Sequence, residues 1–461
     1  MTETEIQRAL PEGWTRGHLR DVLITIEAGK SFTCEARQAN DDEWGIIKVS
    51  AMTWGTFRAE ENKAVPLGKE IDEKYEIRSG DILVSRANTR AYVGAPVLVG
   101  NCRPKLLLSD KSLRLVPGKS VNRKWLLYAL ASPRLRNYIS ETATGTKDSM
   151  RNISQKSLMD APIDIPPVEE QQLIVDALEG HLSRLDAADK NVTTSMLRLR
   201  RLYGSVVQQI LDQLDPCLEE PLERLIREPL RNGHSAPAAE TANGVRTLTL
   251  TAVTTKSFTD VNTKVTSADP ARVSNLWLEP GDILVQRSNT PELVGTSALY
   301  SGDRKWAIFP DLLIRVRTNE RISPEFAALG LASPRIRDYF RASAKGLAGS
   351  MPKIDQGVIL NARLPVPAPD AQLRAVEEAA SHERQITRLL EQLTRTRARS
   401  RNLRAALLRR AQSGRLVTQN PDDEPASVLL AKIAAERTAV AKPVRHRTTR
   451  ATKATHQEHK G

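Results

Sequence analysis

The sequence predicts an α+β protein in which two duplicated α/β domains are separated by two long antiparallel helices that form a coiled-coil spacer. The first observation behind this prediction is an internal repeat at a constant offset of 201 positions. GDILV at residues 80–84 returns at residues 281–285, and LASPR at residues 130–134 returns unchanged at residues 331–335. Because there are only two copies, the repeat indicates a duplicated domain rather than a solenoid.

The second observation is a stripe of apolar residues that follows each copy. From Leu178 to Ile210 the first stripe advances mainly by alternating steps of four and three residues, which is typical of a coiled-coil seam. One long helix is therefore expected at residues 168–214, with Asp189 interrupting its seam. The antiparallel partner helix is expected at residues 369–416.

Each domain is expected to combine several strands with one helix and a polar loop. In the first domain, Gly, Asn and Pro separate expected strands at residues 48–57, 81–85, 95–99 and 105–116. A helix is expected at residues 123–140 and a loop at residues 144–154, and the second domain repeats this order.

The predicted boundaries follow from the repeat and the prolines around the long helices. They are 1–167 for the first domain, 168–215 for the first long helix, 216–368 for the second domain, 369–416 for the second long helix, and 417–461 for an extension with a short helix and a basic tail.

The charge of the chain favours a polyanionic partner. The net charge is +13 and the sequence pI is about 9.7, which makes nucleic acid the first candidate. Eight arginines and no acid lie between residues 395 and 415. This face of the second long helix is either solvated or meets a phosphate backbone or an acidic partner surface.

No targeting or redox feature is predicted. Cys34, Cys102 and Cys217 are scattered, so reduced thiols in a cytoplasmic protein are expected. There is no apolar run of about eighteen residues, and no membrane span or signal peptide is predicted.

No catalytic or metal site is predicted either. Gly29-Lys30-Ser31 resembles the end of a phosphate-binding loop but lacks the earlier glycine, and His382 lacks a second histidine four residues away.

The repeated loops contain the candidate nucleic-acid contacts. Arginine can grip a phosphate or guanine, and asparagine can grip adenine, whereas Asn-Thr after a strand is also ordinary turn chemistry. Both alternatives stay open for these residues. The candidates are Arg86, Asn88, Thr89, Lys147 and Arg151 in the first copy, and Arg287, Asn289, Thr290, Lys345 and Lys353 in the second.

These motifs resemble the specificity subunits of Type I restriction-modification systems. The resemblance rests on the two GDILV strands with their Arg and Asn-Thr, the long helices, and the run AQSGRLV at residues 411–417 followed by DDEPA at residues 422–426. It covers about residues 10–440. It implies that each domain is a target recognition domain that reads one half of a split double-stranded DNA sequence.

The resemblance also implies the partners of the chain. Two methyltransferase subunits would use S-adenosylmethionine, and motor-nuclease subunits would use ATP and magnesium, while this chain would have no catalytic activity and bind no cofactor. Leu173, Leu197 and Leu202 lie outside the strict helix seam and are the expected docking residues for partner subunits. Two other functions remain as alternatives: a nucleic-acid-binding scaffold without sequence choice, and an enzyme in its own right.

Overall fold

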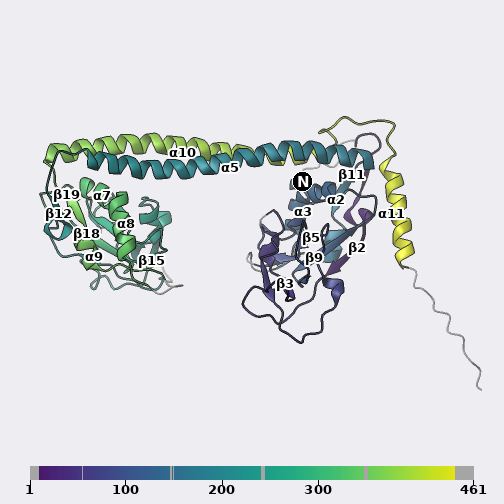
Figure 1. Ribbon diagram of the computed structural model, residues 1–461, viewed down its shortest axis with the longest axis horizontal. Helices are drawn as coiled ribbons and strands as arrows, with labels where there is room; N and C mark the ends of the chain where they lie inside the picture. Colours follow the sequence, from purple (N-terminus) through teal and green to yellow (C-terminus); the bar gives the residue numbers. More distant parts are fainter. Residues whose placement is uncertain are drawn as a thin grey trace, which may run out of the picture. The chain divides into compact units, whose positions relative to one another are not determined.

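The computed structural model describes residues 10–53, 55–145, 148, 150–239, 244–346 and 351–441. The chain divides into two compact units: unit 1 is Met1–Asp189 with Ala398–Gly461, and unit 2 is Lys190–Arg397. Each unit contains part of both long helices, α5 (Val168–Asp212) and α10 (Pro369–Gln412) (Figure 1). The two expected long helices are confirmed, and each ends a few residues before its predicted boundary.

The long helices run antiparallel within each unit. In unit 1, Leu178 near the start of α5 shares a buried core with Leu408 near the end of α10. In unit 2, Val207 near the end of α5 shares a core with Ala375 near the start of α10. The ends of the apolar stripes therefore bury against each other and against the domains, whereas Leu185, Val192, Met196 and Leu199 in the middle of α5 are only partly buried.

The interruption of the seam at Asp189 is compensated by a cation on the partner helix. Within unit 1, Arg404 Nη2 lies 3.6 Å from Asp189 Oδ2 and 2.6 Å from Asp186 Oδ1. A polar seam position of this kind lowers coiled-coil stability but helps to specify the register of the helices.

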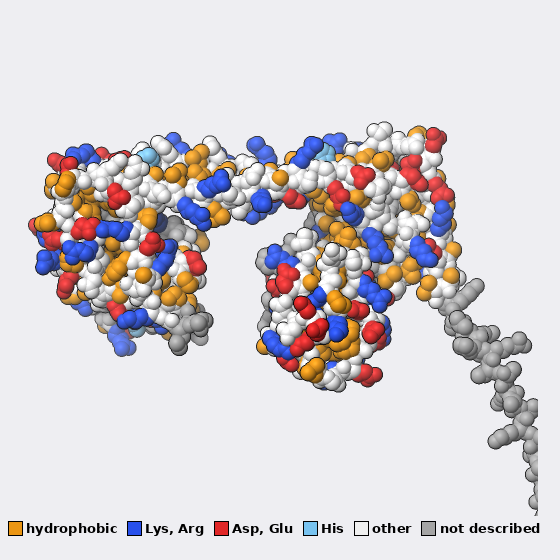
Figure 2. All heavy atoms as spheres, in the orientation of Figure 1, with side chains coloured by type: hydrophobic (Ala, Val, Ile, Leu, Met, Phe, Trp, Pro, Cys, Tyr) orange, Lys and Arg blue, Asp and Glu red, His pale blue; other side chains and the backbone are white. Residues whose placement is uncertain are grey.

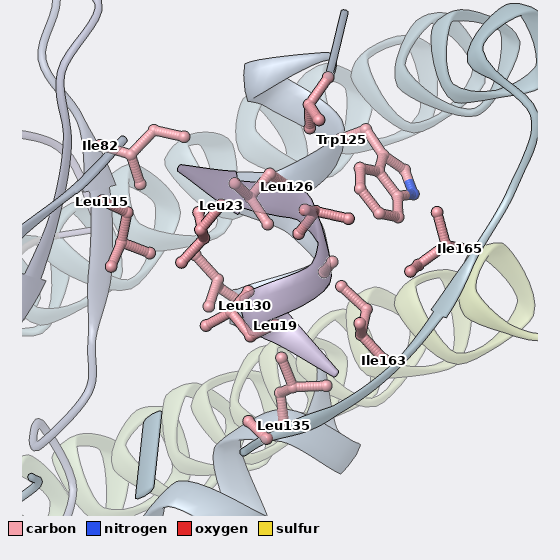
Figure 3. Packing of buried hydrophobic residues seen from close by; sticks show 14 of the residues in the cluster. Leu19, Leu23, Ile82, Leu115, Trp125, Leu126, Leu130, Leu135, Ile163 and Ile165 are labelled. Atoms are coloured by element: carbon pink, nitrogen blue, oxygen red, sulfur yellow. The ribbon is translucent and has the colours of Figure 1, made fainter. Parts of the chain in front are cut away.

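The main sheet of unit 1 is antiparallel, with strand order β2-β9-β5-β7. The bounds are β2 (Leu23–Ala28), β9 (Ser112–Pro117), β5 (Ile82–Ser85) and β7 (Pro96–Leu98). The GDILV repeat forms β5, which is buried on both faces. Ile82 packs into the core around Trp125 and Leu126 (Figure 3), whereas Leu83 packs into a second cluster with Val97.

Smaller elements complete unit 1. The paired strands are β1 (Thr15–His18) with β11 (Pro162–Ile165), β6 (Ala87–Asn88) with β10 (Arg151–Asn152), and β3 (Gly45–Ile47) with β4 (Asn62–Ala64) and β8 (Leu106–Leu107). The helices are α1 (Leu19–Val22), α2 (Arg123–Ala131), α3 (Pro133–Thr142) and α4 (Gln155–Met159).

Unit 2 contains the second copy of the repeat. Its main sheet has the order β13-β18-β16-β17, formed by β13 (Arg231–Asn232), β18 (Leu313–Val316), β16 (Ile283–Gln286) and β17 (Ser297–Leu299). The other elements are β12 (Glu219–Pro221), β14 (Val245–Leu248), β15 (Thr263–Thr266), β19 (Arg363–Pro365), α6 (Leu250–Thr254), α7 (Pro324–Ala332), α8 (Pro334–Ser343) and α9 (Gln356–Leu360).

Unit 2 has two separate cores. One contains Val207 of α5 and Ala375 of α10 and is continuous with the long helices. The other, which we term the outer core, includes Leu248, Ala252 and Phe309. Strand β16 contributes to both, because alternate residues of a strand face opposite sides of the sheet.

Three local predictions are wrong. The strand expected at residues 105–116 is divided into β8, which pairs with β3, and β9, which lies in the main sheet. Residues 48–57 contain a 3-10 helix (Val49–Met52) instead of a strand. The consecutive residues Ala51 and Met52 both pack into the same cluster as Leu83 and Val97, whereas a strand would direct them to opposite faces. The helix expected at residues 123–140 is split into α2 and α3 at Ser132, which caps α3 by accepting a bond from the Leu135 amide (3.3 Å), with Pro133 at the first helical position.

The C-terminal extension forms α11 (Ala426–Ala441), which packs on unit 1. Leu429 and Ile433 are buried there, and Arg437 Nη2 donates to the Arg20 carbonyl over 2.7 Å. Within the part of the chain that the structure describes, no helix is long and apolar enough to cross a bilayer.

Candidate nucleic-acid interface

The structure brings the predicted loop residues together at the end of β5 in unit 1. Strand β6 follows β5 directly and pairs with β10, so that Asn88 lies opposite Arg151. The Ile153 amide donates to the Arg86 carbonyl over 3.0 Å. Arg86, Asn88, Thr89 and Arg151 therefore belong to one edge of the domain, while Lys147 lies outside the described residues.

The same arrangement occurs in unit 2. The Ile354 amide donates to the Arg287 carbonyl over 2.9 Å, and Ser288 forms a β-bridge with Lys353. Lys353 in turn pairs with Lys345. We call residues 287–290 the reading loop of unit 2, and the structure places both lysines beside it.

The two asparagines shape the turns in which they lie. Asn88 Oδ1 accepts a bond from the Thr89 amide, and Asn289 Oδ1 accepts one from the Thr290 amide, each over 2.8 Å. Asn289 Nδ2 also donates to Gln286 Oε1 over 2.8 Å. This geometry favours the turn-chemistry alternative for the asparagines, because their amide groups already have partners.

The arginines of the two edges differ in their availability. Arg151 donates to the carbonyls of Ala143 (2.7 Å) and Gly145 (3.0 Å), and so holds its own loop. Arg86 makes one long bond of 3.4 Å to the Asp110 carbonyl. Among the described residues, no hydrogen bond or ion pair of the Arg287 side chain occurs, so this guanidinium is the one best placed to meet a phosphate or a base edge.

Lys345 and Lys353 form an exposed pair of like charges. Their amides and carbonyls exchange two bonds of 2.9 Å, so the residues are direct cross-strand neighbours. Side chains of such neighbours lie on one face, where two like charges are unfavourable unless an anion lies between or beside them. The corresponding pair in unit 1 is Thr144 and Asn152, which is uncharged.

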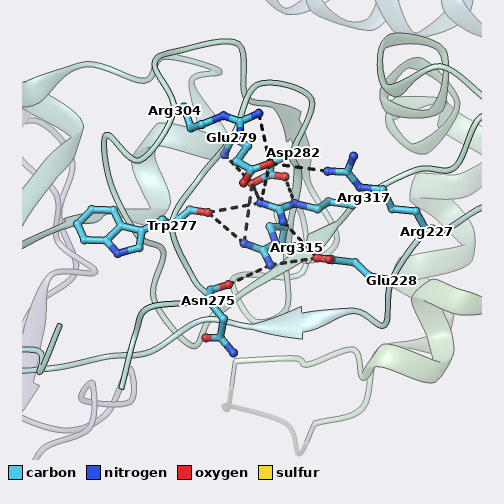
Figure 4. Close-up of polar contacts among 9 residues, drawn as sticks. All are labelled: Arg227, Glu228, Asn275, Trp277, Glu279, Asp282, Arg304, Arg315 and Arg317. Carbon is cyan, nitrogen blue, oxygen red and sulfur yellow. Dashed lines mark hydrogen bonds and ion pairs between the residues drawn. The ribbon is translucent and has the colours of Figure 1, made fainter. Parts of the chain in front are cut away.

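A cluster of arginines and carboxylates in unit 2 was missed by the sequence reasoning (Figure 4). Arg315, only 3% exposed, lies 3.1 Å from Glu228, and Arg317 lies 2.5 Å from Asp282. Burial lowers the pKa of Arg315, and the Asp282 carboxylate opposes this effect. These cations are committed to the fold and are poor candidates for DNA contact.

Unit 1 contains a matching cluster. Arg114 lies 2.9 Å from Glu27 and 3.0 Å from Asp81. Arg114, Glu27 and Asp81 stand at the repeat offset from Arg315, Glu228 and Asp282. The offset was thus the signal that could have revealed this cluster.

The long helices expose several leucines. Leu173, Leu197 and Leu202 of α5 are 48%, 51% and 51% exposed. The sequence reasoning missed three further leucines on α10, although one of them, Leu403, stands at the repeat offset from Leu202. These are Leu373, Leu389 and Leu403.

Some of the arginines of α10 are paired within the chain. Arg404 bonds to Asp186, and Arg395 lies 3.6 Å from Glu391. Arg397 is exposed. Figure 2 shows Lys and Arg side chains along the surface of the helices. The exposed arginines of α10 are therefore available to a polyanion, to an acidic protein surface or to solvent.

The described residues contain no cluster of three or more His, Cys, Asp or Glu side chains suited to a metal ion. Cys34, Cys102 and Cys217 are free thiols, and burial raises the pKa of Cys34 and Cys102.

Residues 11–193 match the family model of the Type I restriction modification DNA specificity domain. The Type I restriction enzyme EcoKI specificity subunit of Escherichia coli (strain K12) is 26% identical over 468 residues, which cover 93% of this chain and 97% of that relative. The Type I restriction enzyme EcoEI specificity subunit of Escherichia coli is 33% identical over 179 residues. That alignment covers 38% of this chain and spans only 30% of the length of the relative.

A solved structure also has a similar fold. A chain from "Structural basis underlying complex assembly and conformational transition of the type I R-M system" has a TM-score of 0.62 at 17% identity, and the match covers 88% of this chain and 100% of that one. The resemblance drawn from the repeats and the α+β fold with two long helices are both confirmed.

Proposed function

We propose that this chain is a Type I restriction-modification specificity subunit that reads a bipartite double-stranded DNA target, with one half-site for each unit. The observation that supports this most directly is the duplicated edge at the ends of β5 and β16. Each edge places a loop with an arginine beside a short ladder, at residues 144–152 in one copy and 345–353 in the other.

The chemistry of these edges suits DNA. Arg287 and the pair Lys345 and Lys353 present cations that have no carboxylate partner among the described residues. Contacts to phosphates position a protein on DNA, and contacts to base edges supply the choice of sequence. The buried arginine clusters stiffen the sheets behind the edges, so the loops start from fixed strand ends.

We propose further that α5 and α10 set the spacer between the half-sites and dock two methyltransferase subunits. A helix pair is stiff and resists bending over this length. Leu173, Leu197 and Leu202 are about half exposed along α5, and a partner protein would cover them.

The chemistry of the complex is assigned to partner subunits. Methyltransferase subunits would bind S-adenosylmethionine, and motor-nuclease subunits would use ATP and magnesium. This chain would supply recognition in the cytoplasm and catalyse no step itself.

The test is a binding measurement with the full chain assembled with its methyltransferase subunits. The affinity for DNA that contains the target sequence of the complex is compared, at fixed salt, with the affinity for the same DNA with scrambled half-sites. Sequence-specific proteins bind their site at least about a thousandfold more tightly. A ratio near one would support the scaffold without sequence choice, and methylation of DNA by the chain alone would identify an enzyme.

A further inference from the structure

The two copies differ at a backbone position that favours glycine. Gly55 in unit 1 has φ +76°, and the residue at the repeat offset is Lys256, with φ +52°. Glycine adopts this left-handed conformation without penalty, whereas a lysine is strained in it. Lys256 adopts this conformation without being glycine, which draws attention to what its side chain contacts.

The Lys256 side chain contacts both long helices of unit 2. Its Nζ lies 3.1 Å from Glu383 Oε1 on α10 and 5.3 Å from the centre of the Tyr203 ring on α5. The ammonium group thus makes an ion pair and a cation–π contact at once. Burial and the neighbouring Glu383 carboxylate raise the pKa of Tyr203, so the phenol stays neutral beside this carboxylate.

Lys256 follows α6, a helix that packs in the outer core. Helix α6 is also hydrogen-bonded to Gln286, the residue that directly precedes the reading loop. The buried Gln286, the last residue of β16, donates through Nε2 to Thr254 Oγ1 (2.7 Å) and to the Leu250 carbonyl (3.1 Å). Its Oε1 accepts the bond from Asn289 Nδ2 over 2.8 Å. A continuous path of contacts therefore runs from the long helices through Lys256, α6 and Gln286 to Asn289.

Unit 1 lacks both side chains of this path. Gly55 has no side chain, and the residue at the offset from Gln286 is Ser85. The Ser85 hydroxyl accepts a longer bond of 3.2 Å from Asn88 and is too short to replace the reach of glutamine. The path is thus a feature of unit 2.

We propose that Lys256 and Gln286 are positioning residues that fix the reading loop of unit 2 against the long helices, and so sharpen the choice of the second half-site. The proposal rests on the proposed function, because it assumes that residues 287–290 face DNA. Neither residue needs to touch DNA. Lys256 holds α6 on the helices, and Gln286 transmits that position to Asn289.

The test compares Lys256→Gly with Lys305→Gly in the full chain. Lys305 also has a left-handed backbone, with φ +61°, and its exposed side chain has no hydrogen bond or ion pair among the described residues. Both substitutions remove one charge and relieve one strained position, but only the first breaks the path. Gln286→Ser, which introduces the residue of unit 1, tests the second link.

The first readout is hydrogen–deuterium exchange of the amides in residues 286–296, which needs no DNA. Loss of an exposed ion pair and a cation–π contact predicts an exchange rate about fivefold higher in Lys256→Gly. Gln286→Ser instead removes three hydrogen bonds of a buried side chain and should raise the rate at least as much. The rate in Lys305→Gly should stay at the wild-type value. Equal exchange in Lys256→Gly and Lys305→Gly would overturn the path.

The second readout is discrimination between cognate DNA and DNA altered in one half-site, with methyltransferase subunits present. Lys256→Gly and Gln286→Ser should lose about fivefold of the discrimination at one half-site only, and Lys305→Gly none. Wild-type discrimination with no difference between Lys256→Gly and Lys305→Gly would refute this inference alone. Absence of discrimination in the wild type would instead refute the proposed function, whatever the exchange data show.

Discussion

At the scale of residues, the two copies have the same backbone with different chemistry at the same places. Lys345 and Lys353 occupy the ladder positions that Thr144 and Asn152 occupy in unit 1. The backbone bonds are preserved, because the amides and carbonyls of both pairs exchange bonds of 2.8 or 2.9 Å. The two ladders therefore share one backbone geometry, and the charge of their side chains differs between the units.

The double substitution Lys345→Thr with Lys353→Asn should weaken DNA binding and leave the fold intact. If both lysines contact phosphates, the slope of log affinity against log salt falls by about 2, since each phosphate contact contributes about 0.9. The thermal stability should stay equal or rise, because the substitutions remove two like charges that lie side by side. Salt titrations of binding check this, with Lys305→Asn as the control for loss of a charge, because asparagine tolerates the positive φ of this position. An unchanged slope would place the phosphate contacts elsewhere.

Glu170 at the start of α5 is a residue whose titration affects stability. It accepts bonds from Trp14 Nε1 (2.7 Å) and Gln419 Nε2 (3.1 Å), and burial raises its pKa above the ordinary 4.5. A carboxyl with a raised folded-state pKa binds its proton more tightly in the folded state. Its contribution to stability is therefore present below pH 4.5 and is lost as pH rises through the raised pKa.

Glu170→Gln should remove this dependence. The free energy of unfolding of the wild type should fall relative to that of the variant as pH rises above 4.5, by about 1.4 kcal/mol for each unit of pKa shift. Urea unfolding over a pH series measures the difference between the two proteins. A difference that does not vary with pH would show that Glu170 titrates normally.

At the scale of elements, the sequence predicted the long helices and the GDILV strands, because periodicity and repetition are properties of the chain alone. It failed where tertiary contacts decide. The chain forms a 3-10 helix at Val49–Met52 where a strand was expected, and α11 packs through Leu429 and Ile433 into the apolar core of unit 1. The arginine clusters also depend on which side chains the fold brings together.

The candidate site was predicted in the same partial way. The repeat located the loops correctly at the ends of β5 and β16. The repeat could not show that the side-chain amides of Asn88 and Asn289 are hydrogen-bonded within their turns, or that Arg151 is bonded to the carbonyls of its own loop. These hydrogen-bond partners are set by the fold.

The exposed leucines allow a test of partner docking at this scale. Leu202→Glu with Leu403→Glu should abolish co-purification with the methyltransferase subunit. The fold should change little, by about 0.5 kcal/mol for each site, because both side chains are half exposed. Thr194→Glu, at an exposed position of α5, is the control for added charge. Retained assembly would move the interface to the recognition domains.

At the scale of the whole molecule, we propose that helix length sets the spacing of the half-sites. The boundary between the units falls after Asp189 in α5 and after Arg397 in α10. Insertion of one heptad at both places keeps the seam in phase. It adds about 10 Å at about 1.5 Å per residue, or about three base-pair steps at about 3.4 Å each.

The expected result of this paired insertion is a longer spacer with both half-sites unchanged. Insertion into α5 alone is the control, because it disturbs the register of the seam and should impair folding or assembly. An active paired variant that kept the original spacer would rule out the helices as the ruler.

The most direct test of bipartite reading is methylation mapping after exchange of one domain. Residues 20–155 are replaced by the matching segment of a related specificity subunit with a different target, and the methylated sequences are mapped. The account predicts that one half of the target changes to that of the donor, while the other half stays as in the wild type. A change in both halves, or in neither, would contradict the central claim that each unit reads its own half-site.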